Sequence, residues 1–295
     1  MKLSVIIPVR EIDEYLINCI DSIVNQNVTD YEVIVIDEEV TDNSTKLLSK
    51  YQNINNLKVF NYNNLVTEGS SLNFGLSKCS GEYVMFVLGT DYLEDNFLKE
   101  VYEYLGDCDL FKYDFSLLGS ELKKEKTNNI NEVVGYKALK ELISLNDNFE
   151  KLNKYIIKRK LLTDNKVVIN KDDFYSNLTI VPYLLTISEK FNNSNLTGYV
   201  YRTENNSFRK SFLDTPRKIA YDVLSKYEYL ESLNFTAIYS EEQKSTLLDY
   251  ISKKVMHELK NLKGKEKKEF KKIIKNKKIK NNIKKESFFK KLLGR

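Results

Sequence analysis

The chain has 295 residues, of which 42% are hydrophobic and 30% charged, with 10 glycines and 3 prolines. This composition predicts a folded protein that buries a core, and it excludes disordered and collagen-like chains. The net charge is only +4, and one histidine with three widely spaced cysteines excludes a multi-histidine zinc site and a disulfide framework.

Strands and helices are predicted to alternate over the first hundred residues. Continuous apolar runs predict strands at residues 3–8, 31–36, 57–61 and 82–88. Helical spacing and capping residues predict helices at residues 13–25, 44–51 and 70–79 between them. This alternation is typical of an α/β fold with a parallel sheet covered on both faces, so a ligand site is expected where the strands end, after Val9, Ile36 and Leu88.

Helices are expected to dominate the rest of the chain. They are predicted at residues 96–105, 135–145, 154–162 and 180–188, followed by a strand at residues 198–202. Asp214-Thr215-Pro216 marks a further helix start, and Ser240 with Gln243 forms a capping box that opens a helix ending before Gly264. The predicted parts are an α/β domain at 1–210, a helical extension at 211–264 and a basic amphipathic tail at 265–295.

The basic tail is expected to contact an anionic partner. Residues 253–295 carry 18 Lys/Arg against 4 Asp/Glu, a net charge of +14, while the preceding 252 residues carry a net charge of −10. Apolar residues from Phe270 to Leu293, among them Ile274, recur at helical spacing, which favours an interfacial helix on anionic lipid and not a nucleic-acid partner. A solvated helical face or a protein-docking segment is the alternative.

No apolar run approaches the roughly 18 to 20 residues that a membrane span needs. The opening apolar stretch ends at Arg10 and is too short for a signal peptide. We therefore expect a cytoplasmic protein.

Candidate site residues follow the first two predicted strands. Pro8 and Arg10 follow the first strand, and Asp37 and Glu38 follow the second. Carboxylates at the end of a buried strand are costly unless they are solvated or bound, and a ribose or base with donor groups is a suitable partner. Asp37 could equally cap the next helix, so the local chemistry alone leaves both interpretations open.

Five phrases in order resemble family-2 glycosyltransferases, which have the GT-A fold. They lie at residues 4–10, 15–26, 31–42, 72–75 and 81–91, and weaker similarity at 152–162 and 199–202 is to bacterial members that act on wall or capsular polymers. The resemblance implies a mixed, mainly parallel GT-A (Rossmann-like) sheet flanked by helices, with a C-terminal helical extension. It also implies a nucleotide-sugar donor bound by Pro8, Arg10, Asp37, Glu38 and Asp91.

The chain departs from the family's metal motif. In the family a D-S-D-D segment closes the fourth strand and holds a divalent cation against the donor diphosphate. Here Leu88, Gly89 and Thr90 replace three of its residues, so Asp91 is the one metal ligand left for Mn²⁺ or Mg²⁺ if the protein is active. Otherwise no cofactor is expected, and Arg10 either grips the phosphates in place of a metal or pairs with a surface carboxylate.

The chain also departs from the family's catalytic base. Inverting members use the Asp of an E-D pair to deprotonate the acceptor hydroxyl, and the family spacing falls here on Ser176-Asn177. Asp172 and Asp173 are the candidate bases if the loop shifts by about one helical turn.

Two functions therefore stay open at this point. One is a glycosyltransferase in bacterial cell-surface polysaccharide or glycoconjugate synthesis, peripheral on the inner face of the cell membrane. The other is a catalytically inactive scaffold or activating subunit of a partner glycosyltransferase.

Overall fold

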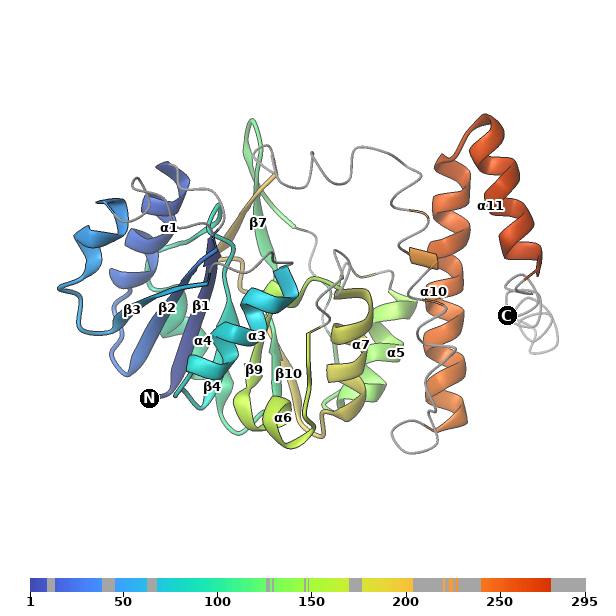
Figure 1. The fold of residues 1–295 in the computed structure, drawn as a ribbon. Coiled ribbons are helices and arrows are strands. Elements are labelled where there is room, and N and C mark those ends of the chain that lie inside the picture. The colour runs from blue at the N-terminus through green and yellow to red at the C-terminus, as the bar shows by residue number, and fades with distance from the viewer. Residues whose placement is uncertain are drawn as a thin grey trace. The chain divides into compact units, whose positions relative to one another are not determined.

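The computed structural model describes most of the chain, in two compact units, Met1–Asn206 and Ser207–Arg295 (Figure 1). The described residues are 1–9, 14–38, 46–62, 68–125, 128, 130–145, 147, 149–169, 177–203, 220, 223–224, 227 and 240–276. Arg10, Asp172, Asp173 and the helix start predicted at residues 214–216 lie outside them. The predicted division into three parts stays a prediction.

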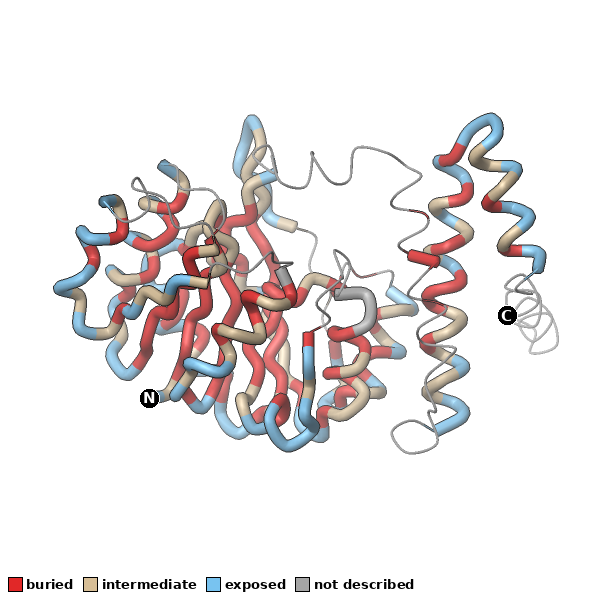
Figure 2. The backbone as a smooth tube through the Cα atoms, viewed as in Figure 1, coloured by how far each residue is buried: buried red, intermediate tan, exposed pale blue. Residues whose placement is uncertain are grey.

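A seven-stranded sheet of order β10-β6-β9-β4-β1-β2-β3 forms the centre of the first unit. Its strands are β1 (Leu3–Val9), β2 (Tyr31–Asp37), β3 (Leu57–Asn61), β4 (Tyr83–Phe86), β6 (Leu110–Lys112), β9 (Tyr155–Lys158) and β10 (Phe191–Asn193). β9 runs antiparallel to β4 and β6, and the other pairs are parallel. The predicted mixed, mainly parallel α/β sheet is confirmed, and Figure 2 shows its central strands buried.

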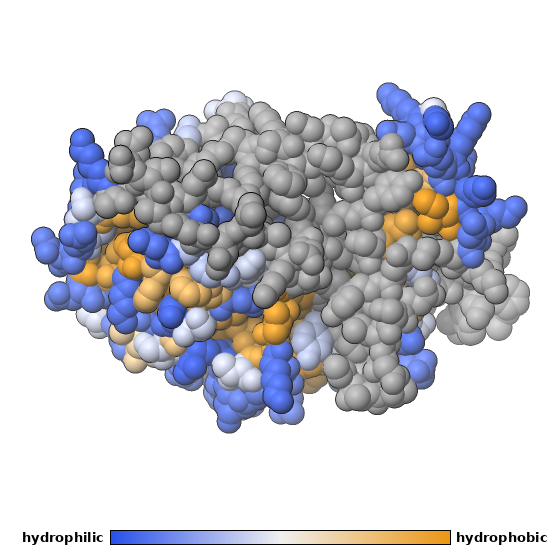
Figure 3. Space-filling model, in the orientation of Figure 1, coloured by the Kyte–Doolittle hydropathy of each residue, from blue (hydrophilic) through white to orange (hydrophobic). Residues whose placement is uncertain are grey.

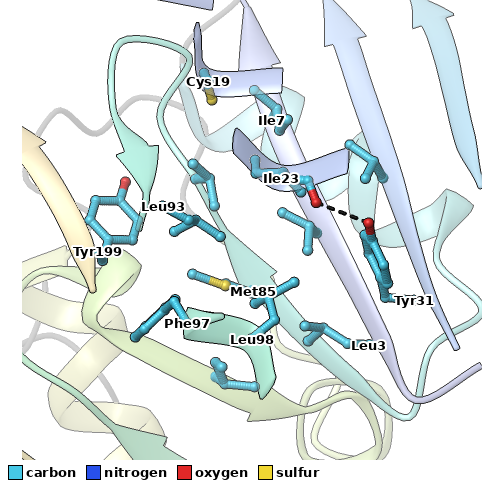
Figure 4. Close-up of a cluster of buried hydrophobic side chains, with 14 of the residues drawn as sticks. Leu3, Ile7, Cys19, Ile23, Tyr31, Met85, Leu93, Phe97, Leu98 and Tyr199 are labelled. Carbon is cyan, nitrogen blue, oxygen red and sulfur yellow. Dashed lines mark hydrogen bonds between the residues drawn. The ribbon is translucent and has the colours of Figure 1, made fainter. Parts of the chain in front are cut away.

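Helices cover both faces of this sheet. On one face α1 (Glu14–Val24) and α4 (Phe97–Leu105) pack against alternate residues of β1 and β2 in a buried cluster, in which Ile7, Ile23 and Leu98 are seen in Figure 4. On the other face lies α3 (Glu68–Lys78), where a Cβ at Gly75 would stand 2.6 Å from Cγ2 of Ile6. Glycine is therefore needed for α3 to approach β1 this closely.

A smaller sheet of order β5-β11-β7-β8 joins distant parts of the same unit. Its strands are β5 (Tyr92–Leu93), β7 (Phe115–Leu118), β8 (Leu122–Lys124) and β11 (Tyr199–Arg202). Outside both sheets, the first unit also contains the helices α5 (Gly135–Ser144), α6 (Arg159–Asp164) and α7 (Asn177–Ile187) and the short 3₁₀ helices η1 (Ser49–Tyr51) and η2 (Leu152–Lys154). Only β11 of this sheet was expected from sequence; β5, β7 and β8 were not, because such short strands show too few repeats of the two-residue period to be recognised. The pairing of β5 with β11 brings residues near 91 and near 200 together.

The helix predicted at residues 154–162 is wrong. Tyr155–Lys158 form β9 in the middle of the sheet, and only Arg159–Asp164 are helical. Tyr155, Ile156 and Ile157 are fully buried there. Aromatic and β-branched residues suit a strand that is covered on both faces, and a short apolar run does not distinguish strand from helix.

Glu32 anchors the amino ends of the strands, opposite the edge where the site is expected. Its Oε1 accepts hydrogen bonds from Ser4 Oγ (2.8 Å), Ser80 N (2.7 Å) and Ser80 Oγ (2.7 Å), and its Oε2 pairs with Lys58 Nζ (3.3 Å). Burial raises the pKa of Glu32, but these bonds outweigh burial and lower the pKa to about 2. The carboxylate therefore ties β1, β2, β3 and the approach to β4 together.

The second unit contains α10 (Glu241–Asn261) and α11 (Gly264–Asn276), which contact each other. The predicted capping box is confirmed, because Gln243 N donates to Ser240 Oγ (3.2 Å) and Ser240 N donates to Gln243 Oε1 (2.7 Å). Phe270 and Ile274 are 0% and 1% exposed. The expectation that these two residues face lipid is therefore wrong, because both are buried within the chain.

Lysines form the exposed side of α11, opposite Phe270 and Ile274. These residues are Lys265, Lys268, Lys271, Lys272 and Lys275. Figure 3 shows hydrophilic side chains around the end of the hairpin where α10 and α11 join. Among the described residues, no helix combines the length and the apolar character that a bilayer span needs.

Candidate functional site

The carboxyl ends of β1, β2 and β4 meet at one edge of the large sheet. Val9 is paired with Asp37, and Ile6 is paired with Phe86. The amide of Glu38 donates to the carbonyl of Val9 (2.9 Å), which holds the first two strand ends together. The structure thus places Pro8, Asp37 and Glu38 at the edge where the sequence predicted the site.

The end of β2 carries two adjacent carboxylates. Asp37 is 2% exposed, whereas Glu38 and Pro8 are half-buried. The carbonyl of Asp37 accepts a hydrogen bond from the amide of Tyr62 (2.8 Å), so Tyr62, the residue after β3, is held at the same edge. Carboxylates in this position are suited to hydroxyl and amino donors of a nucleoside, and their nucleotide-binding role stays a prediction.

Backbone hydrogen bonds fix the position of Leu88, which lies just after β4. The carbonyl of Leu88 accepts hydrogen bonds from Cys19 Sγ (3.5 Å) and from the amide of Asp91 (2.9 Å). The amide of Leu88 donates to Tyr199 Oη (3.2 Å), and its side chain packs against the apolar cluster. Leu88 is therefore partly buried against the core, and its apolar side chain offers no ligand to the edge.

Asp91 is completely buried, with its carboxylate directed at β11. Oδ2 accepts a hydrogen bond from Tyr199 Oη (2.7 Å), and Oδ1 accepts hydrogen bonds from the amide of Arg202 (3.0 Å) and from Thr90 Oγ1 (3.5 Å). Asn153 Nδ2 donates to the same Tyr199 hydroxyl (3.0 Å). Burial raises the pKa of Tyr199, and the negative charge of Asp91 raises it further, so Tyr199 is a neutral donor.

The side chain of Arg202, whose backbone amide bonds Asp91, extends toward α1. It lies between the rings of Tyr15 (4.8 Å to the centroid) and Tyr92 (4.9 Å), and Nη2 donates to Asn18 Oδ1 (2.8 Å). Two aromatic faces and one amide oxygen fix the cation next to α1. Sequence analysis missed these contacts, because Arg202 and Asp91 are 111 positions apart and no local pattern connects them.

Two buried lysines lie at the same edge, where β6 ends and β9 begins. Lys112 and Lys154 are each 1% exposed. Lys112 Nζ pairs with Asp114 (2.8 Å), and Lys154 Nζ pairs with Glu125 (2.6 Å) and more distantly with Asp114 (3.6 Å). Sequence analysis missed this cluster too, since a lysine in an apolar run is ordinarily exposed and only the fold brings its partners to it.

The fold and this edge define the class of the protein. The model of the family "Glycosyl transferase family 2" matches residues 4–164, more than half of the chain, and the chain belongs to that family. The resemblance to family-2 glycosyltransferases and the GT-A fold, both predicted from the sequence, are confirmed.

Two curated relatives illustrate the similarity. Glycosyltransferase GlyA of Streptococcus pneumoniae is 25% identical over 243 residues, which are 76% of this chain and 34% of GlyA. The poly(ribitol-phosphate) β-N-acetylglucosaminyltransferase TarS of Staphylococcus aureus is 33% identical over 110 residues, 36% of this chain and 19% of TarS. The match thus spans about a third of the length of GlyA and about a fifth of that of TarS.

Solved structures share the fold. S. aureus TarS 1–349 in complex with UDP-GlcNAc has a TM-score of 0.68 at 18% identity, covering 88% of this chain and 72% of that chain. The mannosyltransferase PcManGT of Pyrobaculum calidifontis, in complex with GDP-Man and Mn²⁺, has a TM-score of 0.58 at 13% identity, covering 88% and 74%. At these identities the likeness concerns the fold.

The residues after β4 do not fit the divalent cation that the family implies. Leu88 is apolar and packed, Gly89 has no side chain, and Thr90 offers one neutral hydroxyl. Both oxygens of Asp91 accept hydrogen bonds from the chain itself. Over the described ranges, no group of three or more His, Cys, Asp or Glu side chains is arranged to hold a metal ion.

Proposed function

We propose that the protein transfers a sugar from a nucleotide-sugar donor to an acceptor in the synthesis of a bacterial surface polysaccharide or glycoconjugate. The observation that carries this proposal is the family-2 domain, whose sheet edge presents Pro8, Asp37 and Glu38 together. Structures of the same fold bind UDP-GlcNAc and UDP, which supports a nucleotide-sugar partner. Relatives named for poly(ribitol-phosphate) support a surface polymer as the acceptor.

The donor would lie across the ends of β1, β2 and β4. Asp37 and Glu38 supply acceptor oxygens for the ribose and base, and Pro8 shapes the backbone beside them. Arg10 follows β1 directly in the sequence and is the proposed phosphate contact. These four residues keep the roles that the sequence analysis predicted for them, as part of this proposal.

The transfer itself is a displacement at the anomeric carbon of the donor sugar. The acceptor hydroxyl oxygen forms the new glycosidic bond as the bond between the anomeric carbon and the phosphate oxygen breaks. The nucleoside diphosphate leaves, and the hydroxyl proton passes to a base. Asp173 or Asp172 is the proposed base, and both lie outside the described residues.

A catalytically inactive scaffold or activating subunit is the second candidate function. The specific observation in its favour is that the end of β4 carries no carboxylate except the buried Asp91. In this case the fold would serve a partner glycosyltransferase, and the nucleotide edge would be retained without turnover.

The inner face of the cell membrane is the proposed place of action. The lysine side of α11 supports this proposal, since each lysine near an anionic surface contributes about 1 kcal/mol. Because Phe270 and Ile274 are buried, we expect α11 to adsorb by charge and not by insertion. Liposome flotation of the variant Lys268→Ser/Lys272→Ser should fall relative to the control Lys244→Ser/Lys253→Ser on α10; equal flotation of both variants contradicts the proposal.

Nucleotide titration tests the proposed function. The full chain is titrated with UDP, GDP, CDP and dTDP, and sugar release from the matching nucleotide sugars is followed with and without a poly(ribitol-phosphate) acceptor. Saturable binding with acceptor-dependent release of the nucleoside diphosphate is expected. Binding without any release favours the scaffold, and a folded protein that binds none of the nucleotides contradicts the proposal.

A further inference from the structure

The hydrogen bonds of Asp91 join three parts of the first unit. The carboxylate receives Tyr199 Oη and the amide of Arg202 from β11. The same Tyr199 hydroxyl receives the amide of Leu88 from the end of β4 and Nδ2 of Asn153 from η2. Asp91 and Tyr199 together therefore form one buried polar centre that connects β4, β11 and η2.

The chain that follows Asp91 is also held by hydrogen bonds to neighbouring elements. The amide of Leu93 donates to Ser22 Oγ on α1 (3.0 Å), and Leu93 is paired with Tyr199 across β5 and β11. Figure 4 shows Tyr199 and Leu93 next to each other at the border of the apolar cluster. The carboxylate is thus held from both sides by packed elements.

We infer that Asp91 is a structural latch that fastens the end of β4 to β11, and that this chain binds the diphosphate of its donor without a divalent cation. The inference rests on the proposed function, since it concerns the same donor. It replaces the expectation that Asp91 is the remaining metal ligand.

Binding of a cation would compete with the latch. A hard divalent cation needs carboxylate oxygens that face the donor, whereas the carboxylate of Asp91 faces the Tyr199 hydroxyl and the Arg202 amide on β11. To ligate the cation, its oxygens would have to leave Tyr199 and the amide of Arg202, which would leave buried donors unpaired. Thr90 cannot take the place of a carboxylate, because its hydroxyl is neutral and already donates to Asp91 Oδ1 (3.5 Å).

Isothermal titration of the full chain tests the cation part of the inference. UDP, or whichever diphosphate of the panel binds, is titrated in EDTA and in Mn²⁺. We expect the two dissociation constants to agree within about threefold. Tightening by about tenfold or more in Mn²⁺ overturns the inference while leaving the proposed function in place. A folded chain that binds no nucleotide in either buffer overturns both.

Thermal unfolding of Asp91→Asn in metal-free, nucleotide-free buffer tests the latch. A latch predicts a Tm lowered by about 3–8 °C, whereas a metal ligand predicts an unchanged or higher Tm, since a buried charge is removed. The control is Asp109→Asn, whose carboxylate accepts hydrogen bonds from the backbone amides of Glu189 and Lys190 but lies at the amino end of β6. Should Asp91→Asn not fold, Tyr199→Phe keeps the ring and removes the hydroxyl that bonds Asp91, Leu88 and Asn153, and an unchanged Tm in that variant overturns the latch.

Discussion

The carboxyl ends of β2 and β4 lie at the same edge of the sheet, but they carry different chemistry. After β2 two carboxylates, Asp37 and Glu38, adjoin the end of β1. After β4 the apolar Leu88 packs against the core, and the one carboxylate, Asp91, is bonded to β11. The comparison teaches that two strand ends at one edge can differ in role. The acids after β2 stay where we propose that the nucleoside binds, whereas the acid after β4 holds β4 to β11.

The largest expected effect is the loss of stability in Asp91→Ala. The substitution leaves the Tyr199 hydroxyl and the Arg202 amide without their buried acceptor, so we expect the free energy of unfolding to fall by about 3–5 kcal/mol. Urea denaturation followed by circular dichroism measures it. A loss below about 1 kcal/mol would place Asp91 with the exposed carboxylates and remove the difference between the two strand ends.

Asp37→Asn should affect nucleotide binding more than stability, the reverse of the effect expected at Asp91. The amide keeps the volume but loses the negative acceptor for ribose or base, so nucleotide affinity should fall by about ten- to a hundredfold, or about 1.4–2.8 kcal/mol. Its effect on urea stability should stay below that of Asp91→Asn. Unchanged affinity for the nucleotide in Asp37→Asn would show that the end of β2 does not bind it.

Glu32 is a reference for a buried carboxylate with a purely structural task. Its folded pKa of about 2 lies below the ordinary value of 4.5, so its stabilisation is complete above pH 4.5 and is lost as the pH falls toward 2. We expect Glu32→Gln to cost about 1–3 kcal/mol near neutral pH and to flatten this part of the stability profile. Urea denaturation at pH 5, 4 and 3 measures both, and an unchanged slope in the variant contradicts the assignment.

The smallest effect is expected from Thr90→Asp. The variant restores one carboxylate beside Asp91, but position 88 remains a leucine and offers no second carboxylate. Mn²⁺ should therefore tighten nucleotide binding by no more than about threefold. Titration of the variant in EDTA and Mn²⁺ measures it, with Thr90→Asn as the uncharged control. A strong Mn²⁺ response already in the unmodified chain would contradict the assigned difference between the strand ends.

The sequence predicted the end of β2 better than the end of β4, for physical reasons. β1, α1 and β2 are long apolar or amphipathic runs, so their bounds and the position of Asp37 followed from local pattern. The task of Asp91 depends on Tyr199, which lies 108 residues further along and reaches it through the short strands β5 and β11. Burial of Lys112 and Lys154 likewise depends on partners that only the tertiary fold assembles.

A crystal structure of the protein with UDP and Mn²⁺, with anomalous data at the manganese edge, tests the central claim most directly. The account predicts the nucleotide beside Asp37 and Glu38, with Asp91 still bonded to Tyr199 and Arg202 and no anomalous peak in contact with it. A manganese ion coordinated by the Asp91 carboxylate, or a nucleotide bound away from the end of β2, would contradict it.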